Sequence, residues 1–310
     1  MRGVPREVLA VWGLFLVVAV EIFVTYTRLP AAELYHVSNS GLEGGAGRVL
    51  VFLNFPTALV ALSLIPVLLD RLPGRRPRIL AAAGVLLSAV VFWPGVVDQG
   101  DLDLKPVNML PALGVLVAAG MTVAVARRGR VAGPRPSTAG DRLRIAIAAV
   151  ALVLAVPWLL ADLGFSLDGV PVLGTIWQTG ELRTQPGLAE LHPAVHHGHH
   201  HGMDGVLLLL TALLLSRALP AIRRRGLQWP TAAYASLMLA YGAAEIANDF
   251  WLEQVVKRGW TDWKIPDVTR PALSVAWAVV VVAAVAVYYL WFGPRRGRGI
   301  DANVPLGQTP

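Results

Sequence analysis

The amino-acid sequence predicts an all-α polytopic membrane protein with about eight transmembrane helices, arranged as two tandem four-helix repeats in parallel orientation. Three observations predict this fold class. Long apolar stretches recur along the chain, arginine-rich loops alternate with acidic ones, and the two halves share a sequence pattern. Hydrophobic residues make up 55% of the chain and charged residues 15%. A soluble protein would need eight buried helices with almost no polar face, which a chain of this size rarely has.

Eight stretches are long enough to cross a bilayer, which takes about 20 apolar residues in a helix. They occupy residues 8–27, 47–69, 78–97, 107–126, 143–163, 203–219, 230–251 and 270–292. The first could be mistaken for a secretory signal. It contains Glu21, however, and only a weak cleavage match follows it at Ala31-Ala32, so we expect a retained helix.

Charge orients these helices. The loops after the second, fourth and sixth stretches, together with both tails, carry 19 of the 27 basic residues and only 4 of the 20 acidic ones. The other side has 8 bases and 16 acids, so the balance is +15 against −8 and sums to the net charge of +7. By the positive-inside rule both termini are cytoplasmic in a cell membrane. The positive charge therefore indicates topology, and we expect the lipid bilayer as partner and no nucleic acid.

An internal repeat divides the chain. Phe92-Trp93 recurs as Phe250-Trp251, Pro111-Ala112-Leu113 as Pro271-Ala272-Leu273, and the loop pair Glu33-Leu34 as Glu190-Leu191, at spacings of 157 to 160 residues. Units with an even number of helices keep the same orientation, so we expect an axis along the membrane normal. The predicted parts are a first repeat at 1–130, a cytoplasmic linker at 131–142, a second repeat at 143–292 with an outer loop at 164–203, and a disordered cytoplasmic tail at 293–310.

The predicted outer loop of the second repeat is rich in histidine. Six of the seven histidines fall within ten residues: His192, His196, His197, His199, His200 and His201. Neutral imidazole is the commonest metal ligand, so the run predicts a metal site. The chain has no cysteine, which excludes thiolate ligands and disulfides.

The second repeat also carries acids that the first lacks. Glu245 and Asp249 fall within the stretch 230–251, where the aligned positions Leu87 and Val91 of the first repeat are apolar. An ionisable residue inside a span costs about 2.5–3.5 kcal/mol on insertion scales and usually faces an interior or a water-filled cavity. Glu21 and Asp162 are weaker cases of the same kind.

The spacing suggests how the site is built. If residues 192–204 form a helix, His196, His200 and Asp204 lie four apart on one stripe. Gly198 and Gly202 weaken that interpretation, and a loop could bring the same imidazoles together differently. Histidines with a carboxylate suit a divalent transition metal, namely zinc, iron or copper.

Further residues complete the predicted site. Glu245 and Asp249 are the candidate catalytic residues, because they could close the site or act as a base beside the metal. His36, with Glu33, could reach across from the first repeat. The candidate metal ligands are therefore His36, His192, His196, His197, His199, His200, His201 and Asp204.

Three functions remain open. The first is a metal-dependent membrane enzyme, an oxidoreductase or a hydrolase, that acts on a lipid-like or other apolar substrate at an extracytoplasmic site. The second is a divalent metal permease or metal-delivery protein, and the third is a membrane scaffold or assembly factor with a low-affinity histidine tract. A permease needs polar groups through the whole depth, whereas those of this chain collect toward the outer end, so the sequence favours a one-sided site. The motifs of zinc proteases, serine hydrolases and P-loop NTPases are missing.

Overall fold

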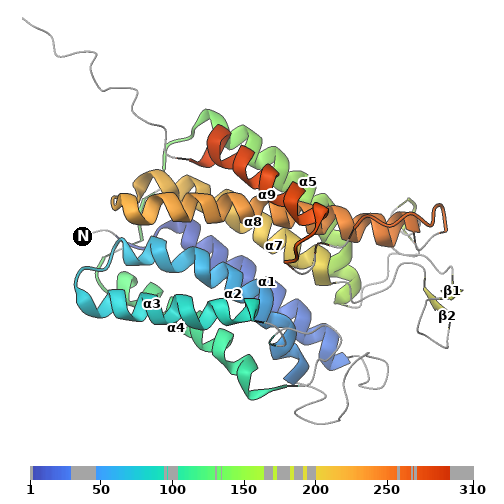
Figure 1. Cartoon of the computed structure of the whole chain (residues 1–310), viewed down its shortest axis with the longest axis horizontal. Helices are drawn as coiled ribbons and strands as arrows, with labels where there is room; N and C mark the ends of the chain where they lie inside the picture. Colours follow the sequence, from blue (N-terminus) through green and yellow to red (C-terminus); the bar gives the residue numbers. More distant parts are fainter. Residues whose placement is uncertain are drawn as a thin grey trace, which may run out of the picture.

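The architecture comes from a computed structural model of the chain (Figure 1). The structure describes residues 3–28, 47–93, 96, 104–129, 131–133, 135–163, 170–172, 182–184, 191–193, 200–256, 259–266, 268 and 271–293.

The described part of the chain is a bundle of helices. Its α-helices are α1 (Arg6–Arg28), α2 (Arg48–Leu69), α3 (Arg75–Ala89), α4 (Met109–Ala126), α5 (Ala139–Asp162), α7 (His200–Ala218), α8 (Arg225–Trp251) and α9 (Val275–Val287). Short 3₁₀ segments adjoin them at η3 (Val90–Phe92), η4 (Pro106–Asn108) and η5 (Leu219–Ala221), and π-helical segments at η6 (Leu252–Val256) and η7 (Tyr288–Phe292). Strands β1 (Leu182–Thr184) and β2 (Leu191–Pro193) form an antiparallel pair.

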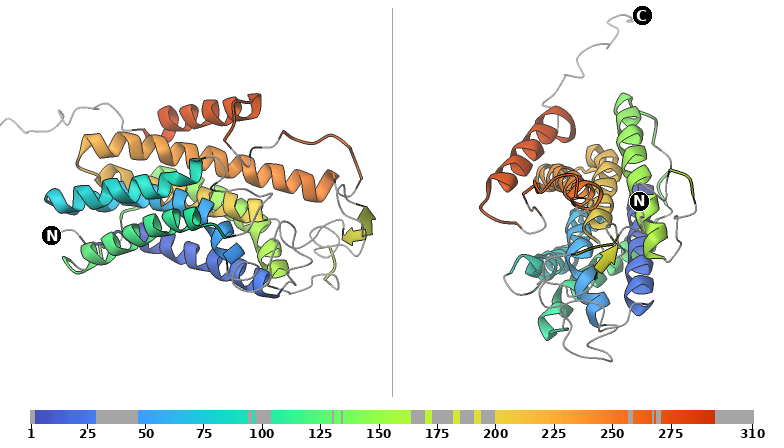
Figure 2. Two further views of the ribbon diagram at one scale, coloured as in Figure 1. Left: turned by 60° about the horizontal axis from the view of Figure 1, so that its bottom comes forward. Right: turned by 90° about the vertical axis from the view of Figure 1, so that its right-hand side faces the viewer.

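The long helices lie side by side along one direction (Figure 1). The starts of α1 and α8 lie at one end of this bundle, and β1 and β2 lie at the other. Helix α7 is central, since it packs against α1, α2, α5 and α8. Nearly all residues of its apolar, membrane-length segment are buried. Seen along the bundle, α5 and α9 lie toward the outside, on different sides of α7 and α8 (Figure 2).

The central place of α7 follows from its sequence. Its segment Val206–Leu210 is an unbroken apolar run, and Leu213 to Leu215 continue it after Thr211 and Ala212. A helix that is apolar on all sides is stable only when other elements cover all of it. Leu207, Leu208 and Leu215 are accordingly among the largest fully buried side chains that the structure describes.

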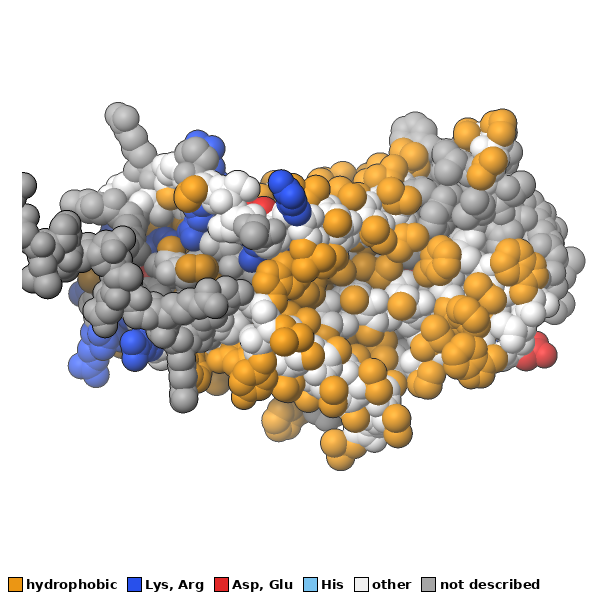
Figure 3. Space-filling model, turned by 90° about the horizontal axis from the view of Figure 1, so that it is seen from above, with side chains coloured by type: hydrophobic (Ala, Val, Ile, Leu, Met, Phe, Trp, Pro, Cys, Tyr) orange, Lys and Arg blue, Asp and Glu red, His pale blue; other side chains and the backbone are white. Residues whose placement is uncertain are grey.

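In the part of the chain that the structure describes, five helices are long and apolar enough to cross a membrane: Arg6–Val24, Val49–Leu69, Pro106–Ala126, Gly202–Ala221 and Val275–Phe292. Many large apolar side chains face outward, as a bilayer requires; Leu116, Val153 and Val282 are more than half exposed. On one face of the bundle, positively charged side chains gather toward one end, and apolar side chains cover most of the described surface along the middle (Figure 3). The chain therefore has the fold of a helical membrane protein. Helices α3, α5 and α8 also lie where apolar stretches are predicted, but eight spans and two tandem repeats stay predictions.

Ion pairs connect the helices at the end of the bundle where α1 and α8 start, which we call the arginine-rich end. Arg135 pairs with Glu7 at the start of α1 (Nε–Oε1, 3.0 Å), and Arg217 at the end of α7 pairs with Asp141 of α5 (Nε–Oδ1, 3.1 Å). Asp141 also pairs with Arg144. The pKa of Asp141 is lowered, first because the backbone N–H of Thr138 donates to its carboxylate and then because of the two arginines. This network ties three helices together at the end opposite to β1 and β2.

Amides fasten the other end. The Asn54 side chain of α2 donates from Nδ2 to the carbonyl oxygen of Asn108 at 2.8 Å, and Asn108 donates to the carbonyl of Val96 at 2.6 Å. Both side chains are almost fully buried. These two amides therefore hold the start of α4 against α2, and they belong to the framework of the bundle.

Candidate functional site

Four buried carboxyl groups come together from three helices. Glu21 of α1, Asp204 of α7, and Glu245 and Asp249 of α8 have exposed fractions of 0, 6, 1 and 2%. Asp204 interacts electrostatically with each of the other three. We call these four residues the acidic cluster. Its members lie late in α1, early in α7 and late in α8, which places the cluster toward the end of the bundle opposite to the arginine-rich end.

A close crossing of α7 and α8 sets the position of two members. A Cβ atom on Gly242 would lie 2.5 Å from the carbonyl oxygen of Gly205, and one on Gly205 would lie 2.7 Å from that of Gly242. The two backbones therefore approach so closely that each position has room only for hydrogen, as at many small-residue contacts in membrane bundles. Asp204 directly precedes Gly205, and Glu245 follows Gly242 by three residues, so the crossing fixes both acids side by side.

Asp204 lies in an unfavourable environment. Its Oδ1 atom is buried and accepts no hydrogen bond within the described part of the chain. The charged groups that act on it, Glu245, Glu21 and Asp249, are all acids. Among the described residues this carboxyl therefore has an unbonded oxygen and no countercharge, which is costly for a buried carboxylate, so we expect a proton or a cation to neutralise it.

Only part of the predicted metal site can be placed. His192 lies in β2, opposite Arg183 of β1, and His200 and His201 lie in the first turn of α7, three to four residues before Asp204. The side chains of these three histidines, and all of His36, His196, His197 and His199, lie outside the described residues. Within the described residues no three histidine, aspartate or glutamate side chains are arranged to hold a metal ion.

The continuous helix over 192–204 is wrong. Leu191–Pro193 is extended and pairs with β1, and α7 begins only at His200. Pro193 suits the edge of a sheet, and residues paired in a strand cannot belong to a helix, so the helix does not reach back to His192. Of the predicted stripe, His200 and Asp204 lie in α7, whereas His196 lies outside the described residues.

Glu245 and Asp249, the two candidate catalytic acids, lie near Asp204, while their predicted role stays a prediction. Glu21, which the sequence marked only as a weaker case, belongs with them. The signal was already present, because Glu21 is the one acid in the interior of the first apolar stretch and lies near its predicted outer end. Asn248 belongs elsewhere, since its Nδ2 donates to the carbonyls of Ile265 and Pro266 and fastens the segment after α8. The side chain of Asp162 is outside the described residues.

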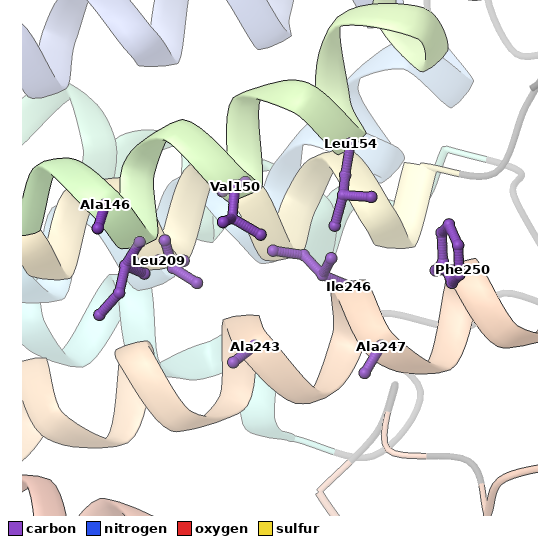
Figure 4. A pocket seen from close by; sticks show the side chains of 10 residues that line it. Ala146, Val150, Leu154, Leu209, Ala243, Ile246, Ala247 and Phe250 are labelled. Atoms are coloured by element: carbon purple, nitrogen blue, oxygen red, sulfur yellow. The ribbon is translucent and has the colours of Figure 1, made fainter. Parts of the chain in front are cut away.

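An apolar groove runs along the outside of the bundle between α5 and α8 (Figure 4). Its volume is about 500 Å³. Helix α5 contributes Ala146, Ile147, Val150, Ala151 and Leu154, α8 contributes Ala243, Ile246, Ala247 and Phe250, and α7 contributes Leu209. Ile246 also packs against the α7–α8 crossing, because its Cγ1 atom would lie 3.1 Å from a Cβ on Gly205.

Known proteins give no guide to the site: no protein-family model, no curated protein and no solved structure matches this chain.

Proposed function

We propose that this chain is an integral membrane protein that binds a divalent transition metal ion through the acidic cluster together with the histidine-rich segment. The observation that carries the proposal is the environment of Asp204, a buried carboxyl with one unbonded oxygen, whose charged neighbours among the described residues are all acids. A bound cation would neutralise this group and would draw Glu21, Glu245 and Asp249 toward a common centre.

The ligand chemistry supports a transition metal in place of calcium or magnesium. Carboxylates alone are hard oxygen ligands and suit magnesium, calcium or manganese. The chain runs from the histidines directly into the cluster, since α7 begins with His200 and His201 one turn before Asp204. Imidazole beside carboxylate shifts the preference toward zinc, iron or copper. The described carboxylates supply one part of such a site, and the histidine-rich segment would supply the other.

We further propose that the site serves a membrane enzyme, a metal-dependent oxidoreductase or hydrolase, that acts on a lipid-like or other apolar substrate. A metal ion at such a site supplies Lewis acidity and activates water. Asp204 would be a ligand, and Glu245 or Asp249 would hold or accept the proton of a reacting group beside it.

Permeation of the metal through the bundle is the alternative function. Three buried hydroxyl groups nearer the arginine-rich end, those of Ser63, Thr231 and Ser236, do not mark such a path, because they donate to the carbonyls of Val60, Leu227 and Ala232 within their own helices. Hydroxyls used in this way offer a passing cation little coordination. The described residues thus support a one-sided site better than a through-path.

The proposed orientation places both termini in the cytoplasm and the acidic cluster with the histidine-rich segment on the extracytoplasmic side of the cell membrane. The arginine-rich end of the bundle supports this orientation. A reporter enzyme that is active only in the cytoplasm, fused after Pro310, should be active in this orientation. An inactive fusion that becomes active when the reporter is moved between α5 and α7 would reverse it.

The test of the function is the metal content of the purified protein, measured by mass spectrometry of the elements. Wild type should contain about one equivalent of zinc, iron or copper per chain. The double substitution His196→Ala/His200→Ala and the single substitution Glu245→Ala should each remove most of this metal. The reason is that the histidine-rich segment and the acidic cluster would both contribute ligands.

Asn248→Ala is the matched control, since it lies in the same turn of α8 as Glu245 but its side chain bonds to loop carbonyls. It should keep the metal. Metal that is lost in the histidine variant but fully kept in Glu245→Ala would contradict a joint site, and would leave only a histidine tract. Zinc uptake into proteoliposomes that is lost in Glu245→Ala would favour the permease.

A further inference from the structure

We propose that the groove between α5 and α8 binds the hydrocarbon chain of a membrane lipid. For the role of that lipid as substrate, the inference rests on the proposed function. The binding of the chain itself follows from the shape, lining and position of the groove.

The groove has the dimensions and lining of a chain site. Its volume of about 500 Å³ lies within the usual range of ligand pockets, about 300–1,000 Å³. Alanines on both helices, such as Ala146 and Ala243, leave the space open, while Leu154 and Phe250 stand on either side of one end (Figure 4). All ten lining residues are apolar, so no side chain there can bind a head group or an ordered water.

The position of the groove determines its occupant. Val150 belongs to the lining and is itself 62% exposed, and its neighbour Val153 is 67% exposed on the same helix. The groove is thus continuous with the outward apolar surface, which in a membrane-spanning bundle contacts lipid chains. Water is excluded as a stable occupant, because a buried water needs two to four polar partners and this lining offers none.

The groove lies at the same depth as the acidic cluster. Its α8 residues 243–250 are the stretch that also carries Glu245 and Asp249. A helix turns by about 100° per residue, so these acids face away from Ala243 and Ala247 toward α7 and α1. Leu154 and Phe250 mark the end of the groove nearest the ends of α5 and α8. A lipid held by its chain in the groove would therefore have its head group at that end of the bundle, where the acidic cluster and the start of α7 lie.

The test uses the full chain in phosphatidylcholine nanodiscs that contain a small fraction of phosphatidylcholine with a photoactivatable diazirine on the acyl chain. Crosslinked peptides are identified by mass spectrometry. Wild type should label the α5 and α8 segments that line the groove. Ala247→Phe fills part of the groove and should lower this labelling about tenfold. This is the loss of affinity expected when roughly two methylene groups of the lipid chain lose their contacts with the protein.

Ala278→Phe is the matched control, because it makes the same change on α9 at an exposed position outside the groove. It should leave labelling of the groove unchanged. Equal labelling of the groove in Ala247→Phe and in Ala278→Phe would overturn the proposal, since it would show ordinary contact with surrounding lipid. Absence of label from α5 and α8 in wild type would also overturn it, because another part of the chain or a second copy would then cover the groove.

Metal content measured on the same samples separates this inference from the proposed function. Ala247→Phe should keep the metal, because the groove lies on the other side of α8 from the acidic cluster. Labelling that depends on the open groove in a protein without metal would support the chain site and contradict the proposed function. Bound metal in a protein whose labelling does not depend on the open groove would support the proposed function and contradict the chain site.

Discussion

Replacement of Gly242 by alanine should lower the stability of the protein by about 1–3 kcal/mol and remove most of its metal. The added Cβ would lie 2.5 Å from the carbonyl oxygen of Gly205 and 2.9 Å from the backbone nitrogen of Leu209. Because both are backbone atoms of α7, a side-chain rotation cannot relieve the clash, and the two helices must move apart. Asp204 and Glu245 would separate with them. Thermal unfolding in detergent and metal analysis of the same preparation measure the two effects.

Gly120→Ala is the control for this change. Gly120 lies inside α4, and a Cβ there would meet nothing within 4 Å. Alanine is the better helix former, so this variant should be neutral or more stable by up to about 1 kcal/mol. If Gly242→Ala matches Gly120→Ala in stability and metal content, the close crossing does not position the site.

Asp204→Asn should act in opposite directions with and without metal. In the metal-free protein the amide removes the cost of burying an ionisable group among three acids, whether that group is charged or must take up a proton, which should raise stability by about 1–3 kcal/mol. The wild type should gain about 2.7 kcal/mol at a metal concentration of 100 times Kd, and Asp204→Asn should lose most of that gain. Thermal unfolding with and without added zinc gives both quantities.

A second aspartate supplies a control of opposite sign. Asp70 accepts hydrogen bonds from the backbone N–H groups of Arg223 and Arg224 at the arginine-rich end. Asp70→Asn should therefore lower stability and leave the gain from metal unchanged. If Asp204→Asn lowers the stability of the metal-free protein as Asp70→Asn does, then Asp204 is a structural acid and the cluster needs no cation.

The positions of the helices could be predicted because each apolar stretch carries its own signal. Helices α2 and α8 end at Leu69 and Trp251, where the predicted stretches end, and a membrane-length run needs no distant contact to be recognised. The helical stretch from His192 could not be judged in the same way. Leu191–Pro193 pairs with β1, which is a contact between two separate segments, and no local sequence pattern predicts such a contact.

The candidate site was predictable only in part, for a similar reason. Glu245 and Asp249 stand out because an acid inside an apolar stretch is unusual, and Asp204 stands out because it follows the histidines. The place of Glu21 depends on the packing of α1 against α7, which the sequence does not encode locally. The role of Gly205 and Gly242 is equally hidden, because glycines are common in membrane helices and only the crossing shows which two meet.

The most direct measurement of the central claim is the X-ray absorption spectrum of the metal in zinc-loaded protein. If the histidine-rich segment and the acidic cluster bind one ion, the spectrum will show imidazole scattering together with carboxylate oxygen at about 2.0–2.2 Å, and Asp204→Asn will change the oxygen shell. A spectrum of imidazole alone, unchanged in Asp204→Asn, would contradict the account, because the histidines would then bind metal without the acids of the bundle.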